Sequence, residues 1–365
     1  MSSNAFTLPP EIENAVKDIA NDHESGARQL ALKALYALKL ATTLFPADIP
    51  SWPKIVNCAW HIVQARPSMK PAIETAILRA LDEIQPPVYP SLDTTSSTID
   101  NLISEESKTL DRICGHFRQL IEEYEVKSIL TLSNSSTIFA ALKDLFEWED
   151  CPEITLTILE SRPLFEGVTL AKSLLPFKPP HVIIELAIDA AAAHYASKSQ
   201  LVIIGADQVD PFTGNIKNKV GSCVAAKFAP MHECWCMTST DKLAPKDGRK
   251  EWSDNFNREW DEDNWQNHDT SEMTSAWPGV EGGERWVVRN MYFEWVPSED
   301  VAGYITEKGN MGWDSLEDIY RERENWKEVW TLLDHSGPSI GNKTRRRATD
   351  DVSKEIKKTQ VSMDK

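Results

Sequence analysis

The chain has 365 residues, an apolar fraction of 41% and a formal net charge of −17 at pH 7. This length is enough to bury a full core and predicts two domains with tails. No apolar run approaches the roughly 18 residues of a membrane-spanning helix, and the acidic balance opposes direct binding to nucleic acid. The first residues lack the basic and then apolar pattern of a secretory signal, so we expect a cytoplasmic protein with no membrane partner.

Residues 1–125 are expected to form a helical N-terminal domain. Apolar residues there recur every three or four positions, which is typical of amphipathic helices. The first predicted helix begins at Thr7. Further helices are predicted over 25–45, 51–66, 71–81 and 99–124. The stretch 85–98 is rich in Pro, Ser and Thr, and it predicts a linker before the last of these helices.

From Lys127 onward, short β-branched runs alternate with helical segments. This alternation predicts an α/β domain with a parallel, doubly wound sheet over residues 126–336. The predicted strands cover 128–132, 154–159, 182–186, 201–204 and 234–238, and the predicted helices cover 136–148, 169–175, 189–196 and 218–228.

The regular pattern fails over 244–286, which is acidic and contains five tryptophans. The simpler interpretation is an insertion whose indoles pack on the main body, and the alternative is a partner-docking arm. Order is expected to resume over 287–296. A helix from Pro297, the segment 304–306, an aromatic helix over 316–333 and a charged tail over 337–365 complete the predicted order.

Polar residues follow several of the predicted strands. Because the loops that leave a parallel sheet at the ends of its strands share one edge, these side chains are expected to converge. Ser133, Asn134 and Ser135 precede a helix, where such residues either bind a phosphate or simply cap the helix. Arg162 either clamps a phosphate or pairs with an acid, and Asp189 is expected to cap its helix.

The loop after the strand at 201–204 carries an acid, an amide and an ammonium: Asp207, Asn218 and Lys219. A carboxylate and a lysine on one loop suit general acid/base work on a sugar phosphate, with the lysine as counter-charge.

Metal and nucleotide motifs give weaker signals. His232, Cys234 and Cys236 offer an imidazole and two thiols, but no second ligand pair lies at zinc spacing. A core strand is favoured over a metal site, and no metal or cofactor is expected. The six cysteines have no framework spacing and fit free thiols in a reducing compartment.

Several stretches together resemble one family, the alpha, beta and delta regulatory subunits of eukaryotic translation initiation factor 2B and their isomerase relatives. The relatives are methylthioribose-1-phosphate isomerase and ribose-1,5-bisphosphate isomerase. The matching stretches are SGARQLALKAL at 25–35, ARPSMKPAIETAI at 65–77, ILTLSNSSTIFAAL at 129–142, ESRPLFEGVTLAKSL at 160–174, IDAAAAHYASK at 188–198, IGADQVDPFTGNIKNKVGS at 204–222 and NMYFEWVPSEDVAGYITEKG at 290–309. The resemblance implies a helical N-terminal domain followed by a Rossmann-like, phosphosugar-isomerase-like domain.

The resemblance also implies roles for individual residues. In the isomerases of this family, a cysteine after the first Rossmann strand and the aspartate of the GAD motif carry catalysis. The aspartate is Asp207 here, and Ser133 stands at the position of the cysteine. With the loop residues above, the expected ligand-binding set is Gly26, Ala27, Arg66, Asn134, Ser135, Arg162, Gly167, Asn218 and Lys219.

An alcohol needs an adjacent base to act at neutral pH, whereas a thiol ionises near pKa ~8.5. The resemblance therefore favours a regulatory-subunit-like protein that binds a phosphorylated sugar or nucleotide and regulates translation initiation. Its expected partners are a second copy of the chain or paralogous subunits of an initiation-factor complex. The alternative is an aldose–ketose isomerase of the methylthioribose-1-phosphate or ribose-1,5-bisphosphate type, with Asp207 as acid/base and Ser133 as a positioning hydroxyl. A third hypothesis is a scaffold whose insertion docks an unrelated partner.

Overall fold

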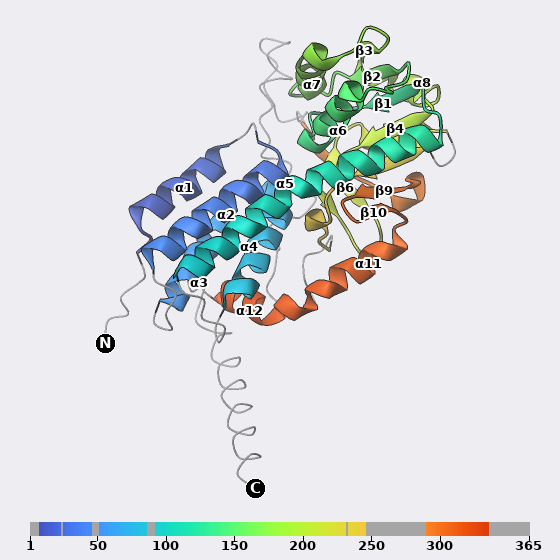
Figure 1. Cartoon of the computed structure of the whole chain (residues 1–365). Helices are drawn as coiled ribbons and strands as arrows, with labels where there is room; N and C mark the ends of the chain where they lie inside the picture. The colour runs from blue at the N-terminus through green and yellow to red at the C-terminus, as the bar shows by residue number, and fades with distance from the viewer. Residues whose placement is uncertain are drawn as a thin grey trace, which may run out of the picture.

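The computed structural model describes residues 7–22, 25–45, 51–85, 92–230, 233–245 and 290–335. A layer of helices from the first part of the chain lies beside a domain of strands and helices, and one long helix runs along both (Figure 1). The predicted fold class is confirmed, with a helical N-terminal region followed by an α/β domain around a mostly parallel sheet. The part of the tryptophan-rich stretch over 246–286 lies outside the described residues.

The helical region is built from amphipathic helices that bury one face in a common core. Three of them have a proline in the first turn, where the missing N–H costs nothing and the fixed φ favours the helix. The helices are α1 (Pro10–Asn21), α2 (Ala27–Leu44), α3 (Trp52–Gln64), α4 (Lys70–Ile84) and α5 (Leu92–Glu123), with a 3-10 turn η1 (Pro67–Met69) before α4.

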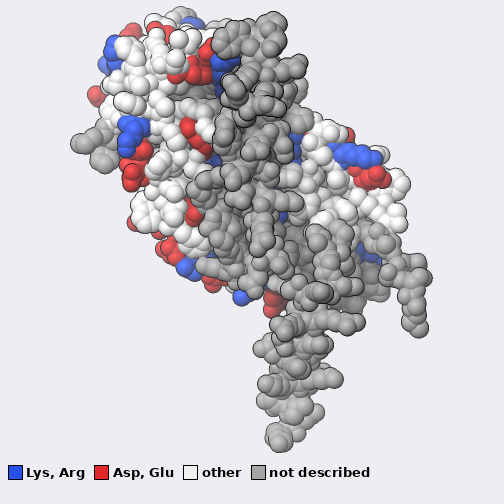
Figure 2. Space-filling view, turned by 180° about the vertical axis from the view of Figure 1, so that it is seen from behind, with Lys and Arg blue, Asp and Glu red and all other residues white. Residues whose placement is uncertain are grey.

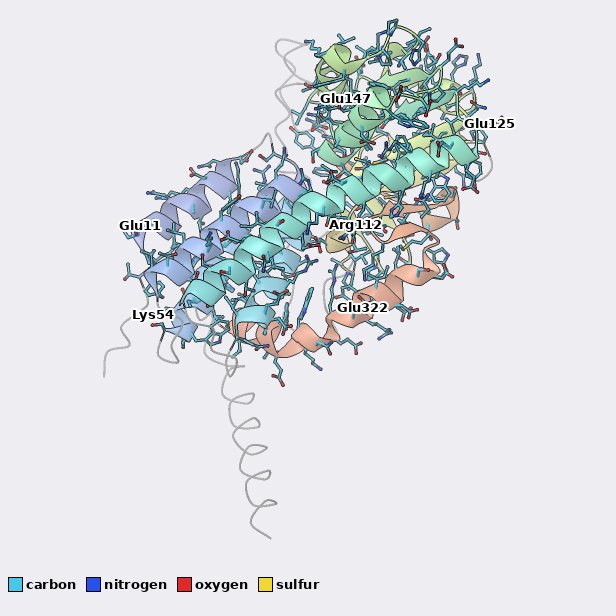
Figure 3. The ribbon with its side chains drawn as sticks, viewed as in Figure 1. Glu11, Lys54, Arg112, Glu125, Glu147 and Glu322 are labelled. Atoms are coloured by element: carbon cyan, nitrogen blue, oxygen red, sulfur yellow. The ribbon has the colours of Figure 1, made fainter. Side chains whose placement is uncertain are left out.

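The long helix α5 belongs to two cores. Ile99 packs in the helical cluster, whereas Ile113 and Phe117 pack against the sheet. Arg112 marks the point where α5 passes from the helical layer to the α/β domain (Figure 3). The boundary of the predicted domains at 125/126 stays a prediction, because this one helix serves both.

Helix α5 begins at Leu92, so the predicted linker is wrong for residues 92–98. Serine and threonine are weak helix formers, and their density suggested a connection. Thr95 and Ile99 are nevertheless both fully buried. Tertiary packing therefore overrides local propensity in the first turns of this helix.

The main sheet has seven strands in the order β10-β9-β7-β4-β1-β2-β3, and all neighbouring pairs except β9–β10 are parallel. Its strands are β1 (Ser128–Thr131), β2 (Thr155–Leu159), β3 (Ile183–Ala187), β4 (Leu201–Ile204), β7 (Cys234–Met237), β9 (Gly303–Thr306) and β10 (Gly309–Met311). The helical connections are α6 (Ser136–Glu147), α7 (Glu166–Leu174), η2 (Leu175–Phe177), η3 (Asp189–Ala191), α8 (Ala192–Ala196) and α9 (Ser222–Phe228). Strand β4 is buried along its whole length at the centre of the sheet.

A second, antiparallel sheet covers the end of β4. It contains β5 (Gln208–Val209), β6 (Ile216–Lys219) and β8 (Phe293–Val296), in that order. The helix predicted over 218–228 therefore begins only at Ser222, because Asn218 and Lys219 end strand β6. Gly221, with φ of 101°, makes the turn between strand and helix in a conformation that favours glycine.

The C-terminal segment returns to the helical region. A short 3-10 turn η6 (Ser298–Asp300) stands where a helix was predicted from Pro297. The predicted aromatic helix is divided into α11 (Asp314–Arg321), η7 (Glu322–Trp326) and α12 (Lys327–His335). Val329, Trp330 and Leu333 join the helical core, so α12 lies beneath the N-terminal helices (Figure 1).

The 3-10 turn η4 (Thr240–Lys242), just after β7, is held from both parts of the molecule. Arg79 of α4 lies 2.7 Å from Asp241 and 3.4 Å from Glu106 of α5. Burial, together with the charge of Asp241 and the hydrogen bond with it, raises the pKa of Glu106 to about 8, although the nearby Arg79 acts in the opposite direction. The Arg79 guanidinium and the proton on Glu106 thus compensate a cluster of buried acids. No helix among the described residues is both long and apolar enough to cross a membrane.

This cluster makes stability depend on pH in a defined direction. The pKa of Glu106 moves from an ordinary 4.5 to about 8 on folding, so the folded protein binds the extra proton between these values. The resulting stability is fully present below pH 4.5 and is lost as pH rises through about 8. In Glu106→Gln the side chain stays neutral at every pH. The free energy of urea unfolding should therefore fall less steeply with pH than in wild type, and the two slopes should differ by up to ~1.4 kcal/mol per pH unit.

Glu105→Gln is the matched control, because Glu105 is the exposed neighbour that pairs with Lys108 at the surface. It should keep the wild-type pH dependence. An equal pH slope in wild type and Glu106→Gln would contradict the assignment of the proton to Glu106.

Candidate functional site

The loops after β1 and β2 hold each other in unusual backbone conformations. Ser133 and Ser161 have φ of 67° and 62°, in the left-handed region that non-glycine residues rarely adopt. The Ser133 N–H donates to the Ser161 hydroxyl at 2.7 Å, and this hydroxyl donates to the Leu159 carbonyl at 2.9 Å. Because such outliers persist only where the surroundings enforce them, this pair of loops is a candidate functional element.

A chain of polar contacts joins the β1 loop to α7 and β6. The Ser133 hydroxyl donates to Glu166 Oε2 at 2.7 Å, and Lys219 Nζ lies 3.0 Å from Glu166 Oε1. The Lys219 ammonium also lies 5.2 Å and 5.4 Å from the ring centroids of Tyr292 and Phe293, which is cation–π range. Two of the predicted residues, Ser133 and Lys219, are thus linked through Glu166, which the sequence analysis did not select.

Asp207 lies just beyond β4, and its backbone N–H donates to the Lys217 carbonyl at 2.8 Å. The side chain is half-buried, so solvent still reaches it. Burial raises the pKa of this carboxyl above its ordinary value, and the nearby charge of Glu166 raises it further. The charges of Lys242, Lys217 and Lys219 act in the opposite direction. A carboxyl in these surroundings can hold a proton and deliver it to a ligand.

Lys242 is the main functional candidate that sequence reasoning missed. Its buried ammonium donates to the Ala206 carbonyl, next to Asp207, and burial lowers its pKa. The available signal was its place just after β7, since β7 is the parallel neighbour of β4 and its loop opens at the same edge.

Arg28, in the first turn of α2, was also not selected. Its positive charge lowers the pKa of Lys242, so the two cations are close. Its buried Nε has no hydrogen-bond partner among the described residues. A buried donor without a partner costs about 1–3 kcal/mol, and an anionic ligand would remove this cost.

The starts of two helices meet beside these side chains. A methyl group added at Gly26 would lie 3.3 Å from Ser136 Oγ, so the N-termini of α2 and α6 are in contact. Ala27 is buried behind Gly26, and Ser135 caps α6 by accepting from the Ile138 N–H at 3.4 Å. Because free N–H groups and helix dipoles converge there, the position favours an anion such as phosphate.

Asn218 and Gly205 line the same edge. A methyl group on Gly205 would lie 3.4 Å from Ser135 Oγ and 3.6 Å from Asn218 Oδ1, so the three residues are neighbours. The Asn218 amide donates to Ser222 Oγ at 2.8 Å. This bond fixes the amide orientation, with Oδ1 toward Gly205 and Ser135.

Other predicted residues serve different contacts in this structure. Arg66 donates to the carbonyls of Ala20 and Asp22 at 3.1 Å and 2.8 Å, which ties the segment after α3 to the C-terminal end of α1. Arg162 is exposed, with its guanidinium 4.9 Å from the Phe165 ring. Asn134 is exposed. The assignment of Arg66, Arg162 and Asn134 to a ligand stays a prediction.

Asp189 does not cap its helix as expected. Its two carboxylate oxygens accept from the N–H groups of Ser161 and Arg162 at 2.8 Å and 2.7 Å. Asp189 therefore fixes the loop after β2, while the cap position of η3 is Ile188. Spacing along the chain could not reveal this bond, because it crosses from the end of β3 to the end of β2.

The strand that carries Cys234 and Cys236 is confirmed as β7, and both thiols are buried in the sheet core. Among the described residues no group of three or more His, Cys, Asp or Glu side chains is placed to hold a metal ion. His232 lies outside the described residues.

The candidate site has an excess of positive charge. Lys217, Lys219, Lys242 and Arg28 supply four cations, against the two carboxyl groups of Asp207 and Glu166. The whole chain carries −17, and acidic and basic side chains lie close together on the described surface of the reverse face (Figure 2). A local surplus of cations in an acidic protein points to an anionic ligand.

The structure gives Gly167 a packing role. A methyl group there would lie 1.8 Å from the Leu159 carbonyl oxygen, which is too close for any side chain. Gly167→Ala should therefore push α7 away from β2 and lower the free energy of urea unfolding by about 3 kcal/mol. Gly115→Ala is the control, because nothing lies within 4 Å of its added methyl group in the middle of α5. It should raise stability by about 0.5–1 kcal/mol, and equal effects of the two substitutions would contradict the packing role.

Comparison with known proteins agrees with this architecture. A family model described as "Initiation factor 2 subunit family" matches residues 23–312. The ribose 1,5-bisphosphate isomerase of Thermococcus kodakarensis is 26% identical over 332 residues, which are 88% of this chain and 97% of the relative. The structure of Pyrococcus horikoshii translation initiation factor eIF-2B aligns with a TM-score of 0.61 at 20% identity, over 83% of this chain and 98% of that one.

The 5-methylthioribose 1-phosphate isomerase of Pyrococcus horikoshii has the same fold, with a TM-score of 0.60 at 16% identity over 87% of this chain and 88% of that chain. The family model covers well over half of the 365 residues. The chain therefore belongs to the initiation factor 2 subunit family, as the motifs at 25–35, 160–174 and 204–222 predicted.

Proposed function

We propose that this protein binds a phosphorylated pentose at the edge of its sheet and catalyses an aldose–ketose isomerisation, with Asp207 as an acid/base. The observation that carries the proposal is the group of three lysines, Lys217, Lys219 and Lys242, around the protonatable carboxyl of Asp207, with Arg28 close to Lys242. The full-length similarity to ribose 1,5-bisphosphate isomerases supports the same reaction class and names its first substrate to test.

The phosphates would be bound where positive charge and free N–H groups gather. The joined starts of α2 and α6, with the unpartnered Nε of Arg28, suit one phosphate. The charges of the buried Lys219 and Lys242, which act on Asp207, would stabilise negative charge that develops on oxygen when an aldose is enolised beside this carboxyl, without touching the ligand. These groups are already fixed by packing, so little reorganisation would be needed as the charge forms.

Asp207 would move a proton between sugar oxygens. A protonated Asp207 can donate to the ring oxygen when the bond from C1 to that oxygen breaks. The resulting carboxylate can take the hydroxyl proton from C2 when the new carbonyl forms. The raised pKa favours the first step, because it increases the fraction of Asp207 that carries a proton.

Asp207→Asn should lower kcat for ribose 1,5-bisphosphate by about 10²- to 10⁴-fold, because an amide cannot deliver this proton. Binding measured by calorimetry should change little, since the amide keeps the shape of the neutral acid. Glu147→Gln is the control, as Glu147 is exposed at the end of α6 (Figure 3), and it should keep wild-type turnover. Full activity in Asp207→Asn would refute the acid/base role, and wild type that neither binds nor converts the sugar would refute the function.

A second candidate function is the regulatory-subunit type, in which the same site binds a phosphorylated sugar or nucleotide without turnover. Ser133 at the expected cysteine position and the fold shared with initiation factor eIF-2B support it. An exposed apolar strip on and beside edge strand β3 supports a protein partner: Ile183, Leu186 and Ile188 are 56%, 52% and 59% exposed. We propose that a second copy of the chain or a paralogous subunit covers this strip.

Leu186→Asp should reduce the mass of the purified protein, measured by light scattering, to that of one chain, because a charge in the strip opposes its burial. Leu332→Asp is the control on α12, where Leu332 is 47% exposed, and it should leave the mass unchanged. A wild-type monomer would exclude the homodimer, and clean isolation of a homo-oligomer without initiation-factor subunits would count against the complex-subunit version.

A further inference from the structure

The only hydrogen-bond partner recorded for the Ser133 side chain within the described ranges is the Glu166 carboxylate, at 2.7 Å. A serine hydroxyl does not remove a proton from carbon at neutral pH unless a base takes its own proton first. Here the hydroxyl already donates to Glu166. The basic atom of this pair is therefore the carboxylate oxygen.

Glu166 is accessible, whereas its partner cation is not. The Glu166 side chain is 27% exposed, and that of Lys219 is 4% exposed. The ion pair with Lys219 is therefore made on the buried side of Glu166, while part of the Glu166 side chain stays open to solvent. A ligand at the sheet edge can therefore contact Glu166 but not the buried Lys219 ammonium.

The backbone aims Glu166 at the site. Phe165, with φ of 54°, turns the chain into α7 one residue earlier, and Gly167 packs directly on the Leu159 carbonyl one residue later. Glu166 therefore lies in the first turn of a helix that packs closely against the end of β2. The charge of Glu166 is close enough to Asp207 to raise the pKa of that carboxyl.

We propose that Glu166 is the base that removes the C2 proton of the sugar, with Ser133 and Lys219 as positioning residues. This inference rests on the proposed isomerase function. Two carboxyl groups in different surroundings then divide the work. Glu166, paired with Lys219, receives a proton from carbon, and Asp207, whose pKa is raised, exchanges protons with oxygen.

The steps balance for an aldose phosphorylated at C1. Asp207 protonates the ring oxygen as the C1–O bond breaks with its electron pair on oxygen. Glu166 takes the C2 proton, and the C–H electron pair forms the C1=C2 double bond of an enol. The C2 hydroxyl proton then passes to Asp207, its electron pair completes the C2 carbonyl, and Glu166 returns its proton to C1. Both carboxyl groups regain their starting states, and no other reactant is needed.

The test uses the full chain and ribose 1,5-bisphosphate deuterated at C2. Turnover and loss of deuterium to water are measured together, with ligand binding followed by calorimetry. Glu166→Gln should lower both rates by about 10²- to 10⁴-fold while binding stays within a few-fold of wild type. Ser133→Ala should lower turnover by about 10-fold or less and keep the deuterium exchange, because it removes an orienting bond and not the base.

Rescue by a small carboxylate such as formate distinguishes a role of Glu166 as the base from a purely structural role. Formate should restore deuterium exchange to Glu166→Ala and should not restore turnover to Asp207→Asn. A wild-type rate of deuterium exchange in Glu166→Gln, or a larger loss of exchange in Ser133→Ala than in Glu166→Gln, would overturn the assignment of Glu166 as the base. Either result would leave the isomerase function standing. A wild-type protein with no turnover and no exchange would overturn the isomerase function together with it.

Discussion

The turn η4 is the contact on which the arrangement of this molecule depends. Asp241 in this turn pairs with Arg79 of the helical region, and Arg323 of η7 donates to the carbonyls of Thr240 and Leu243. Asp241 is buried, so loss of Arg79 would leave its carboxylate without this compensating charge and would destabilise the fold. The next residue of the turn is Lys242. The interactions that join the two parts of the protein therefore also place a cation beside Asp207.

The loops after β1 and β2 show how local strain is maintained. Ser133, Ser161 and Phe165 all have positive φ, and such conformations cost on the order of 1–3 kcal/mol each. The compensation comes from bonds between the loops, namely Ser133 to Ser161 and Ser161 to Asp189. These bonds cross three adjacent strands of the sheet. The backbone is thus rigid where the candidate base and its hydroxyl partner meet.

The sequence was informative where structure follows a local period. Strands β1, β2 and β4 and the helices of the N-terminal region were found from spacing, and the sheet edge brought Ser133, Asp207 and Lys219 together as expected. The antiparallel sheet was missed because β6 pairs with β8, which follows it only after the stretch over 246–289. No local pattern encodes such a pairing.

Glu166, Lys242 and Arg28 were missed for related reasons. None of the three carries a motif of its own that would mark it along the chain. Their importance comes from contacts between elements, such as the ion pair of Glu166 with Lys219 or the closeness of Arg28 to Lys242. Ion pairs between different parts of a fold are set by tertiary packing, which charge patterning along the chain does not reveal.

An acidic chain can contain a cationic site because most of its acidic side chains lie too far from the site to affect it strongly. Surface charges separated by more than about 8 Å interact weakly at physiological ionic strength, so most of the −17 charge is screened from the site. Buried ammonium groups such as those of Lys219 and Lys242 are screened far less. A small dianion that reaches the sheet edge experiences the local cations, whereas a long polyanion also meets the acidic surface around it. This difference favours a compact phosphorylated ligand over an extended nucleic acid.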